Sequence, residues 1–256
     1  MRFATALRGI GAGWLALAAV CQTATAQSVV DLPIGGGGSE RVLYLPAAQP
    51  RATVILLTGG DGVLQIGGDG SVSPEGNFLV RTRSFWAANG ISAMVLASPN
   101  GESLFGRRHL PEYAAALAAA VDYARQNGAP VWLIGTSMGT IAAVNGGAHL
   151  PGRIAGIVLT SSITRPNRAA GETVFDSDPS AVAVPALVMS NTGDTCVASP
   201  PGDGPRLLEG LAASPRKDFV TVSSSEIRSD PCEASSPHGY LGIEGEALQR
   251  IAGWIR

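Results

Sequence analysis

Ser137 lies in a Gly-x-Ser-x-Gly pattern that spans residues 135–139, read as Gly-Thr-Ser-Met-Gly. An apolar run typical of a strand precedes it, and a stretch of small residues that can begin a helix follows it. A sharp strand-to-helix turn needs residues without bulk beside the serine, because the two backbones approach closely there. The pattern therefore predicts a serine hydroxyl held at the carboxyl end of a strand, where it could act as a nucleophile.

A serine hydroxyl is a poor nucleophile at neutral pH, so this chemistry requires a general base within hydrogen-bonding reach. The chain has three histidines. His238 follows the last expected strand and precedes the last expected helix, which would bring it to the same sheet edge as Ser137. His109 and His149 occupy expected helix boundaries, and they remain the alternative candidates for the base.

The base must in turn be oriented by an acid. Asp194 follows an apolar strand-like run, ALVMSN, and lies between the serine and the histidine in the chain. Asp176, Asp178 and Asp203 lie in loops with no strand immediately before them. A turn residue after Gly193 is the alternative interpretation of Asp194.

The N-terminus has the pattern of a secretory signal peptide. Residues 1–26 contain two arginines, no acid, an apolar stretch over Ile10–Val20 and a final Ala-Thr-Ala. The apolar stretch is too short to span a bilayer, and cleavage before Gln27 would leave 230 of the 256 residues. A lipoprotein signal ending at Cys21 is an alternative, although the bulky residue before that cysteine is atypical of such sites.

Export would leave two cysteines, Cys196 and Cys232, in an oxidising compartment that favours their pairing. Cys196 lies two residues after Asp194, and Cys232 lies six residues before His238. One disulfide would therefore join the loop of the acid to the loop of the base, which favours Asp194 over the other aspartates.

Composition limits the classes of partner. The formal net charge is −2, and it becomes −4 once the two arginines of the signal are removed. The absence of a basic run makes nucleic acid an unexpected partner, and no later segment has the length and apolarity for stable membrane insertion. With 45% hydrophobic and 15% charged residues, residues 27–256 can bury the core of a single domain.

Strands and helices alternate along residues 27–256, which predicts an α/β fold with a mostly parallel, doubly wound sheet and helices on both of its faces. The expected strands are 28–34, 40–46, 52–60, 91–100, 131–136, 153–162, 184–191 and 217–225. The expected helices are 77–90, 111–128, 141–150, 204–213 and 243–255. Residues 35–38 are expected to be a flexible hairpin connection, 61–76 a glycine-rich loop, and 162–184 an irregular segment.

Acyl transfer also needs donors for the developing oxyanion. The backbone amide of Met138, the residue after the serine, is one candidate. Gly60, in the glycine-rich turn with which the expected strand 52–60 ends, is the other, and its neighbour Asp61 is an alternative.

Essentially the whole of residues 27–256 resembles the α/β-hydrolase superfamily. The resemblance lies in the order of the strands and helices and in the chain order Ser137, Asp194, His238. The resemblance implies an eight-stranded, mostly parallel sheet and a serine-nucleophile hydrolase that needs no metal or cofactor. The chain looks lidless, like compact cutinase-type or dienelactone-hydrolase-like members. It departs from the family at the oxyanion loop, where Thr58-Gly59 replaces the common His-Gly and the lipase-type HGGG signature is absent.

From these features we expect an exported, periplasmic or secreted serine hydrolase that cleaves small or polymeric carboxylic esters through an acyl-enzyme intermediate. A peptidase or amidase with the same triad is one alternative. A non-catalytic secreted binding protein on this fold is another.

Overall fold

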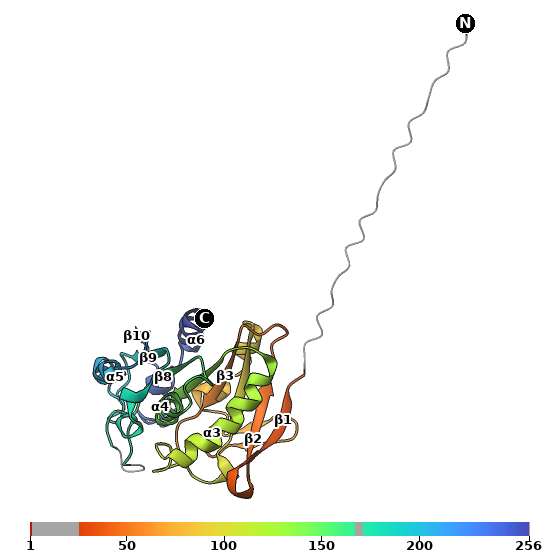
Figure 1. Cartoon of the computed structure of the whole chain (residues 1–256). Coiled ribbons are helices and arrows are strands. Elements are labelled where there is room, and N and C mark those ends of the chain that lie inside the picture. The colour runs from red at the N-terminus through yellow and green to blue at the C-terminus, as the bar shows by residue number, and fades with distance from the viewer. Residues whose placement is uncertain (2–25, 167–170, 256) are drawn as a thin grey trace.

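A computed structural model describes residues 1, 26–166 and 171–255 of the chain. The predicted signal peptide lies outside the described residues except for Met1 and Ala26. Figure 1 shows one layered body in which a central sheet lies between helices.

The main sheet has eight strands in the order β1-β2-β6-β3-β7-β8-β9-β10. Their bounds are β1 Ser28–Ile34, β2 Gly38–Leu45, β3 Ala52–Leu57, β6 Ile91–Leu96, β7 Val131–Thr136, β8 Gly156–Thr160, β9 Ala186–Asn191 and β10 Lys217–Val222. The pairs β1/β2 and β2/β6 are antiparallel, and the remaining pairs are parallel. The predicted eight-stranded, mostly parallel sheet is therefore confirmed.

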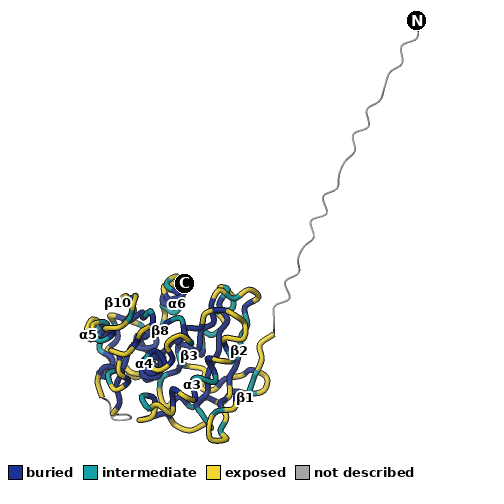
Figure 2. The backbone as a smooth tube through the Cα atoms, in the orientation of Figure 1, coloured by how far each residue is buried: buried dark blue, intermediate teal, exposed yellow. Residues whose placement is uncertain are grey.

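Helices cover both faces of this sheet, as expected for a doubly wound domain. The longer helices α3 Pro111–Ala124 and α4 Gly139–His149 pack with α5 Gly204–Gly210 on one face. On the other face lie α1 Phe78–Arg81, α2 Ser84–Ala88 and α6 Glu244–Trp254. Central strands such as β3 and β7 are buried at every position, which explains their unbroken apolar sequence, and Figure 2 shows this buried centre.

Short 3₁₀ turns complete the connections between these elements. They are η1 Gly35–Gly37, η2 Pro99–Gly101, η3 Arg125–Asn127, η4 Val174–Ser177, η5 Pro179–Ala181, η6 Pro201–Asp203 and η7 Pro237–Gly239. Gly128, which follows η3, has a φ of 77°, so glycine suits the left-handed end of this helical segment.

Two local predictions differ from the structure. The expected helix over 77–90 is divided into α1 and α2, and at the break the Thr82 hydroxyl donates to the Phe78 carbonyl at 2.6 Å. The expected loop over 61–76 contains a small antiparallel ladder of β4 Gln65–Ile66 and β5 Val72–Ser73. Burial of the apolar residue in each short strand explains why this segment is ordered.

Glu40 is an exception in the core, because its carboxyl group is fully buried on β2 and neither of its oxygens has a hydrogen-bond partner among the described residues. Burial raises the pKa of Glu40 from 4.5 to about 8. The side chain is therefore mostly protonated in the folded protein at neutral pH.

Within residues 26–166 and 171–255, no helix has both the length and the apolar character needed to cross a bilayer.

Candidate active site

Ser137 occupies the turn between β7 and α4, at the carboxyl end of a central strand. Its φ is +54°, a left-handed conformation that costs a non-glycine residue about 1–3 kcal/mol and is concentrated at functional sites. The backbone holds it there, because the Ser137 amide donates to Thr160 O at 3.0 Å and its carbonyl accepts from the Thr140 amide at 2.9 Å.

Three glycines allow this turn to form. A Cβ on Gly135 would overlap the backbone of Gly139, and a Cβ on Gly139 would overlap the Leu57 carbonyl. A Cβ on Gly59 would lie 2.9 Å from Cβ of Ser137. Close packing of β7, α4 and the end of β3 therefore explains why both glycines of the sequence pattern are needed.

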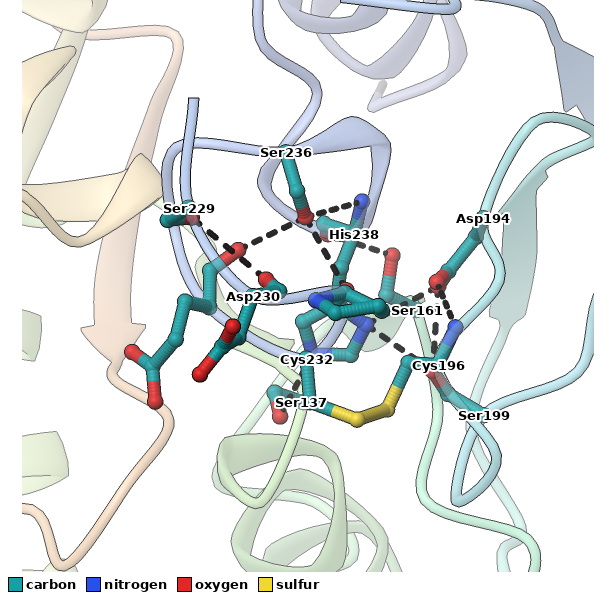
Figure 3. The surroundings of a disulfide bond; sticks show 12 residues. Ser137, Ser161, Asp194, Cys196, Ser199, Ser229, Asp230, Cys232, Ser236 and His238 are labelled. Carbon is teal, nitrogen blue, oxygen red and sulfur yellow. Dashed lines mark hydrogen bonds and ion pairs between the residues drawn. A yellow bond between two sulfur atoms is a disulfide. The ribbon is translucent and has the colours of Figure 1, made fainter. Parts of the chain in front are cut away.

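His238 lies on η7, and its Nε2 is 2.9 Å from Ser137 Oγ. Its Nδ1 is 2.9 Å from Asp194 Oδ2. An ionised carboxylate can only accept hydrogen bonds, so Nδ1 carries the proton and Nε2 is left to accept the Ser137 proton. The three residues form a continuous hydrogen-bonded chain, which Figure 3 shows beside the disulfide.

Asp194 follows β9 and is almost completely buried. Its Oδ1 accepts from the Cys196 amide at 2.8 Å, and its Oδ2 accepts from the Ser199 hydroxyl at 3.0 Å as well as from His238. These hydrogen bonds replace the water that burial removes from the carboxylate.

Sequence reasoning missed Ser199, whose Oγ also lies 2.8 Å from His238 Nδ1. This hydroxyl is therefore shared between the acid and the imidazole. The sequence gives little indication of this role. Ser199 lies five residues after Asp194 in an irregular loop, and no spacing rule singles it out.

The loop of His238 is held by side chains from distant elements. Ser161, which follows β8, donates its hydroxyl to the His238 carbonyl at 2.8 Å, and its amide donates to the hydroxyl of the buried Tyr240 at 3.1 Å. The Tyr240 hydroxyl donates to Met189 O at 3.0 Å, which joins this loop to β9. Ser236 accepts from the His238 amide at 3.1 Å.

Arg81 supports the same loop from α1. Its guanidinium donates to the carbonyls of Gly239 at 2.6 Å, Gly76 at 2.7 Å and Ala234 at 3.3 Å. It also pairs with Glu244 at 2.9 Å. One side chain of α1 therefore binds the carbonyl of Gly239, which lies in η7, and that of Ala234, which precedes η7.

The disulfide predicted from export is formed between Cys196 and Cys232, which are 36 residues apart. It links the loop that follows Asp194 to the loop that precedes His238, and both cysteines line the cleft above Ser137.

The other two histidines contact different partners. His109 Nδ1 lies 2.8 Å from the buried carboxylate of Glu172, and His149 Nδ1 lies 3.0 Å from the Asn145 carbonyl. Neither of these contacts involves Ser137, so His238 is the histidine that the structure brings to the serine.

The alternative aspartates also have other partners. Asp203 pairs with Arg165 at 2.9 Å, and Asp176 closes a capping box with Thr173. Asp178 precedes η5 as its N-cap, and its carboxylate accepts from the Ser180 hydroxyl at 2.5 Å.

The predicted oxyanion donors both belong to residues that line the cleft. Met138 stands at the start of α4, where helix amides and the helix dipole favour an anion. Gly60 has a φ of +61° in the turn after β3, a conformation that suits glycine. Its neighbour Asp61 also lines the cleft and binds Leu104 through its own carbonyl at 2.8 Å. Both assignments remain predictions.

A cleft of about 540 Å³ opens above Ser137 and His238. Its walls are largely apolar and include Leu64, Phe78 and Ile163. Two further wall residues are large exposed hydrophobics, Phe105 at 37% and Val197 at 77% exposure. Such a cavity is large enough for a small organic molecule.

In the described part of the chain, no group of three or more His, Cys, Asp or Glu side chains is placed to hold a metal ion.

No protein-family model matches the sequence, and no curated protein matches it. Solved structures do resemble it. An esterase from Pyrococcus furiosus has a TM-score of 0.65 at 12% identity, over 90% of this chain and 91% of that one. A dienelactone hydrolase from Anabaena variabilis has a TM-score of 0.60 at 17% identity, over 90% and 96% of the two chains. The dipeptidyl peptidase 4 of Porphyromonas gingivalis has a TM-score of 0.63 at 12% identity, over 90% of this chain and 35% of that one.

Proposed function

Since the chain has the α/β-hydrolase fold, we propose that it is a serine hydrolase that cleaves carboxylic esters. The observation that carries this proposal is the hydrogen-bonded chain from Ser137 Oγ through His238 to Asp194, at the floor of an apolar cleft. Such a chain supplies a nucleophile, a base and an orienting acid.

In the proposed reaction, Ser137 Oγ attacks the ester carbonyl carbon while its proton passes to His238 Nε2. The buried Asp194 carboxylate stabilises the imidazolium that forms, and the amides of Gly60 and Met138 stabilise the oxyanion. The tetrahedral intermediate then collapses, the carbon–oxygen bond to the alcohol breaks, and His238 donates its proton to the leaving oxygen.

The acyl group, now bonded to Ser137, is removed by water. His238 takes a proton from the attacking water, and a second tetrahedral intermediate forms. Its collapse breaks the bond to Ser137 Oγ, which regains the proton, and the carboxylic acid is released.

The test is the intact mass of residues 27–256 after treatment with a fluorophosphonate probe, together with turnover of p-nitrophenyl butyrate. We expect a single adduct that is absent in Ser137→Ala. Turnover should fall by roughly a thousandfold or more in Ser137→Ala and in His238→Ala.

His109→Ala is the matched control, because its ring binds Glu172 instead of Ser137. It should keep both the adduct and the turnover. A folded wild-type protein with no adduct and no turnover would refute the proposal and favour a binding protein. A Ser137→Ala variant with full activity would refute the assignment of the nucleophile.

A peptidase or amidase activity is the second candidate, since the structural neighbours include a dipeptidyl peptidase. The same triad can attack an amide, and leaving-group preference depends on the shape of the cleft. Parallel assays with a p-nitrophenyl ester and a p-nitroanilide of the same acyl group distinguish the two activities.

We also propose that the chain is exported to the periplasm or secreted. The pattern of residues 1–26 and the pairing of Cys196 with Cys232 support this. N-terminal sequencing of the natural protein should begin at Gln27. A natural chain that retains Met1 would refute it, and a lipid-modified Cys21 would indicate a lipoprotein instead.

A further inference from the structure

The cleft above Ser137 contains two acidic side chains, Asp61 and Glu233, and none of the described residues that line it is a lysine or an arginine. Asp61 belongs to the turn after β3 and Glu233 to the loop that precedes η7, so the two charges come from different walls. Both residues are exposed.

Neither carboxylate forms an ion pair in the described part of the chain. The Asp61 carboxylate accepts the Val63 amide at 3.0 Å, which leaves its charge in place. The cleft mouth therefore carries two carboxylates that no salt bridge within the described residues neutralises.

Two arginines lie behind the cleft walls, and each has anionic neighbours. Arg81 pairs with Glu244. Arg108 is buried, and the negative charges near it are those of Glu172 and Asp61. Neither guanidinium lines the cleft, so neither offers a substrate anion a direct partner.

We propose, on the basis of the proposed function, that this cleft selects esters with uncharged acyl and alcohol groups and discriminates against esters that carry a carboxylate. A carboxylate entering the cleft would lose hydration to apolar walls without gaining a cationic partner. It would also be repelled by Asp61 and Glu233. The acid product acquires the same unfavourable charge, so the same repulsion favours its release.

The experiment compares kcat/KM for two substrates of similar shape, p-nitrophenyl 6-methylheptanoate and mono-p-nitrophenyl adipate. The terminal isopropyl group of the first has nearly the size of the terminal carboxylate of the second, so the main difference is charge. The readout is the ratio of kcat/KM for the anionic ester to that for the neutral ester, at low salt and at about 0.5 M salt.

We expect the wild-type ratio to be about 0.1 or lower at low salt. In the double variant Asp61→Asn/Glu233→Gln the ratio should rise about fivefold, because each exposed charge roughly 8 Å from a substrate anion contributes about a twofold effect. At about 0.5 M salt the difference between variant and wild type should fall below about twofold. Asparagine retains the oxygen that accepts from Val63, so the turn is preserved.

Glu209→Gln is the matched control, because Glu209 is an exposed carboxylate on α5 that does not line the cleft. It should leave the ratio unchanged. Two outcomes would overturn this inference but leave the proposed function intact, because both esters are still turned over. One is a wild-type ratio near one, and the other is a ratio that the double variant does not change. If neither ester is turned over, the proposed function is refuted and this inference with it.

Discussion

Replacing Glu40 by glutamine should make the protein more stable, and increasingly so as the pH rises. Glu40 is fully buried, with no hydrogen-bond partner for its carboxyl oxygens among the described residues. Glutamine has nearly the shape of the protonated acid but cannot ionise. The variant therefore removes the cost of a buried negative charge without creating a cavity.

The magnitude follows from the pKa of Glu40, which burial raises from 4.5 to about 8. Because the folded state binds the proton more tightly than the unfolded state, the favourable contribution of protonated Glu40 is fully present below pH 4.5 and is lost as the pH rises to about 8. Each pH unit in that window costs about 1.4 kcal/mol. The wild type should therefore lose about 3 kcal/mol by pH 7 and about 4 kcal/mol by pH 8, whereas Glu40→Gln should show no such loss.

The assay is urea unfolding of both proteins between pH 5 and 8, with the free energy of unfolding compared at each pH. We expect the two proteins to agree within about 1 kcal/mol near pH 5 and to separate by about 3 kcal/mol at pH 7. Glu209→Gln, at an exposed site, should follow the wild type throughout. A Glu40→Gln variant that differs from the wild type by the same amount at every pH would refute the reasoning, since Glu40 would then have an ordinary pKa.

Three further predictions concern the surroundings of the triad. Ser199→Ala should lower kcat for the ester about three- to tenfold with little change in KM, because the buried acid loses one donor, and Ser199→Thr should restore part of the rate. Arg81→Met should lower kcat about tenfold by freeing the carbonyls in and beside the turn of His238, whereas Arg51→Met should leave kcat unchanged because Arg51 binds carbonyls near the C-terminus. The double variant Cys196→Ala/Cys232→Ala should lose about 4 kcal/mol of unfolding free energy in denaturant titrations, given the 36-residue separation.

Each of these predictions has an opposing result. An unchanged kcat in Ser199→Ala would mean that the hydroxyl does not support the acid. Equal losses in Arg81→Met and Arg51→Met would point to general destabilisation instead of positioning. A cysteine-free variant as stable as the wild type would show that the bond does not constrain the unfolded chain.

The sheet could be predicted because its signals are local. Buried parallel strands are unbroken apolar runs, such as Ala52–Leu57, and turns between them contain glycines. The break between α1 and α2 could not be predicted, because the whole stretch has a helical pattern and contains neither a proline nor a glycine at the break. The β4/β5 ladder consists of two-residue strands, which are too short to show periodicity.

The proximity of Ser137, Asp194 and His238 could be predicted because parallel strands bring their carboxyl ends to one edge of the sheet. The supporting contacts could not. Arg81 has the appearance of a solvated helix residue, and its partners near His238 are more than 150 positions away in sequence.

The burial of Glu40, in contrast, is indicated by the sequence pattern of β2. Alternation along β2 places it on the same face as the buried Val42, and the register pairs it with the buried Leu32. A carboxyl group at such a position indicates either a buried partner or a raised pKa, and the structure has the second.

The Cys196–Cys232 bond also makes one wall of the cleft harder to deform than the others. One wall contains a covalent cross-link between two loops, whereas the walls formed by residues 58–64, 74–78 and 105 contain none. Substrates of different width must then be accommodated by rearrangement on the uncrosslinked side, where Phe105 is exposed and can change rotamer. Tolerance of bulky groups should therefore be adjustable at Phe105 and Leu64 with little disturbance of the wall that carries the acid and the base.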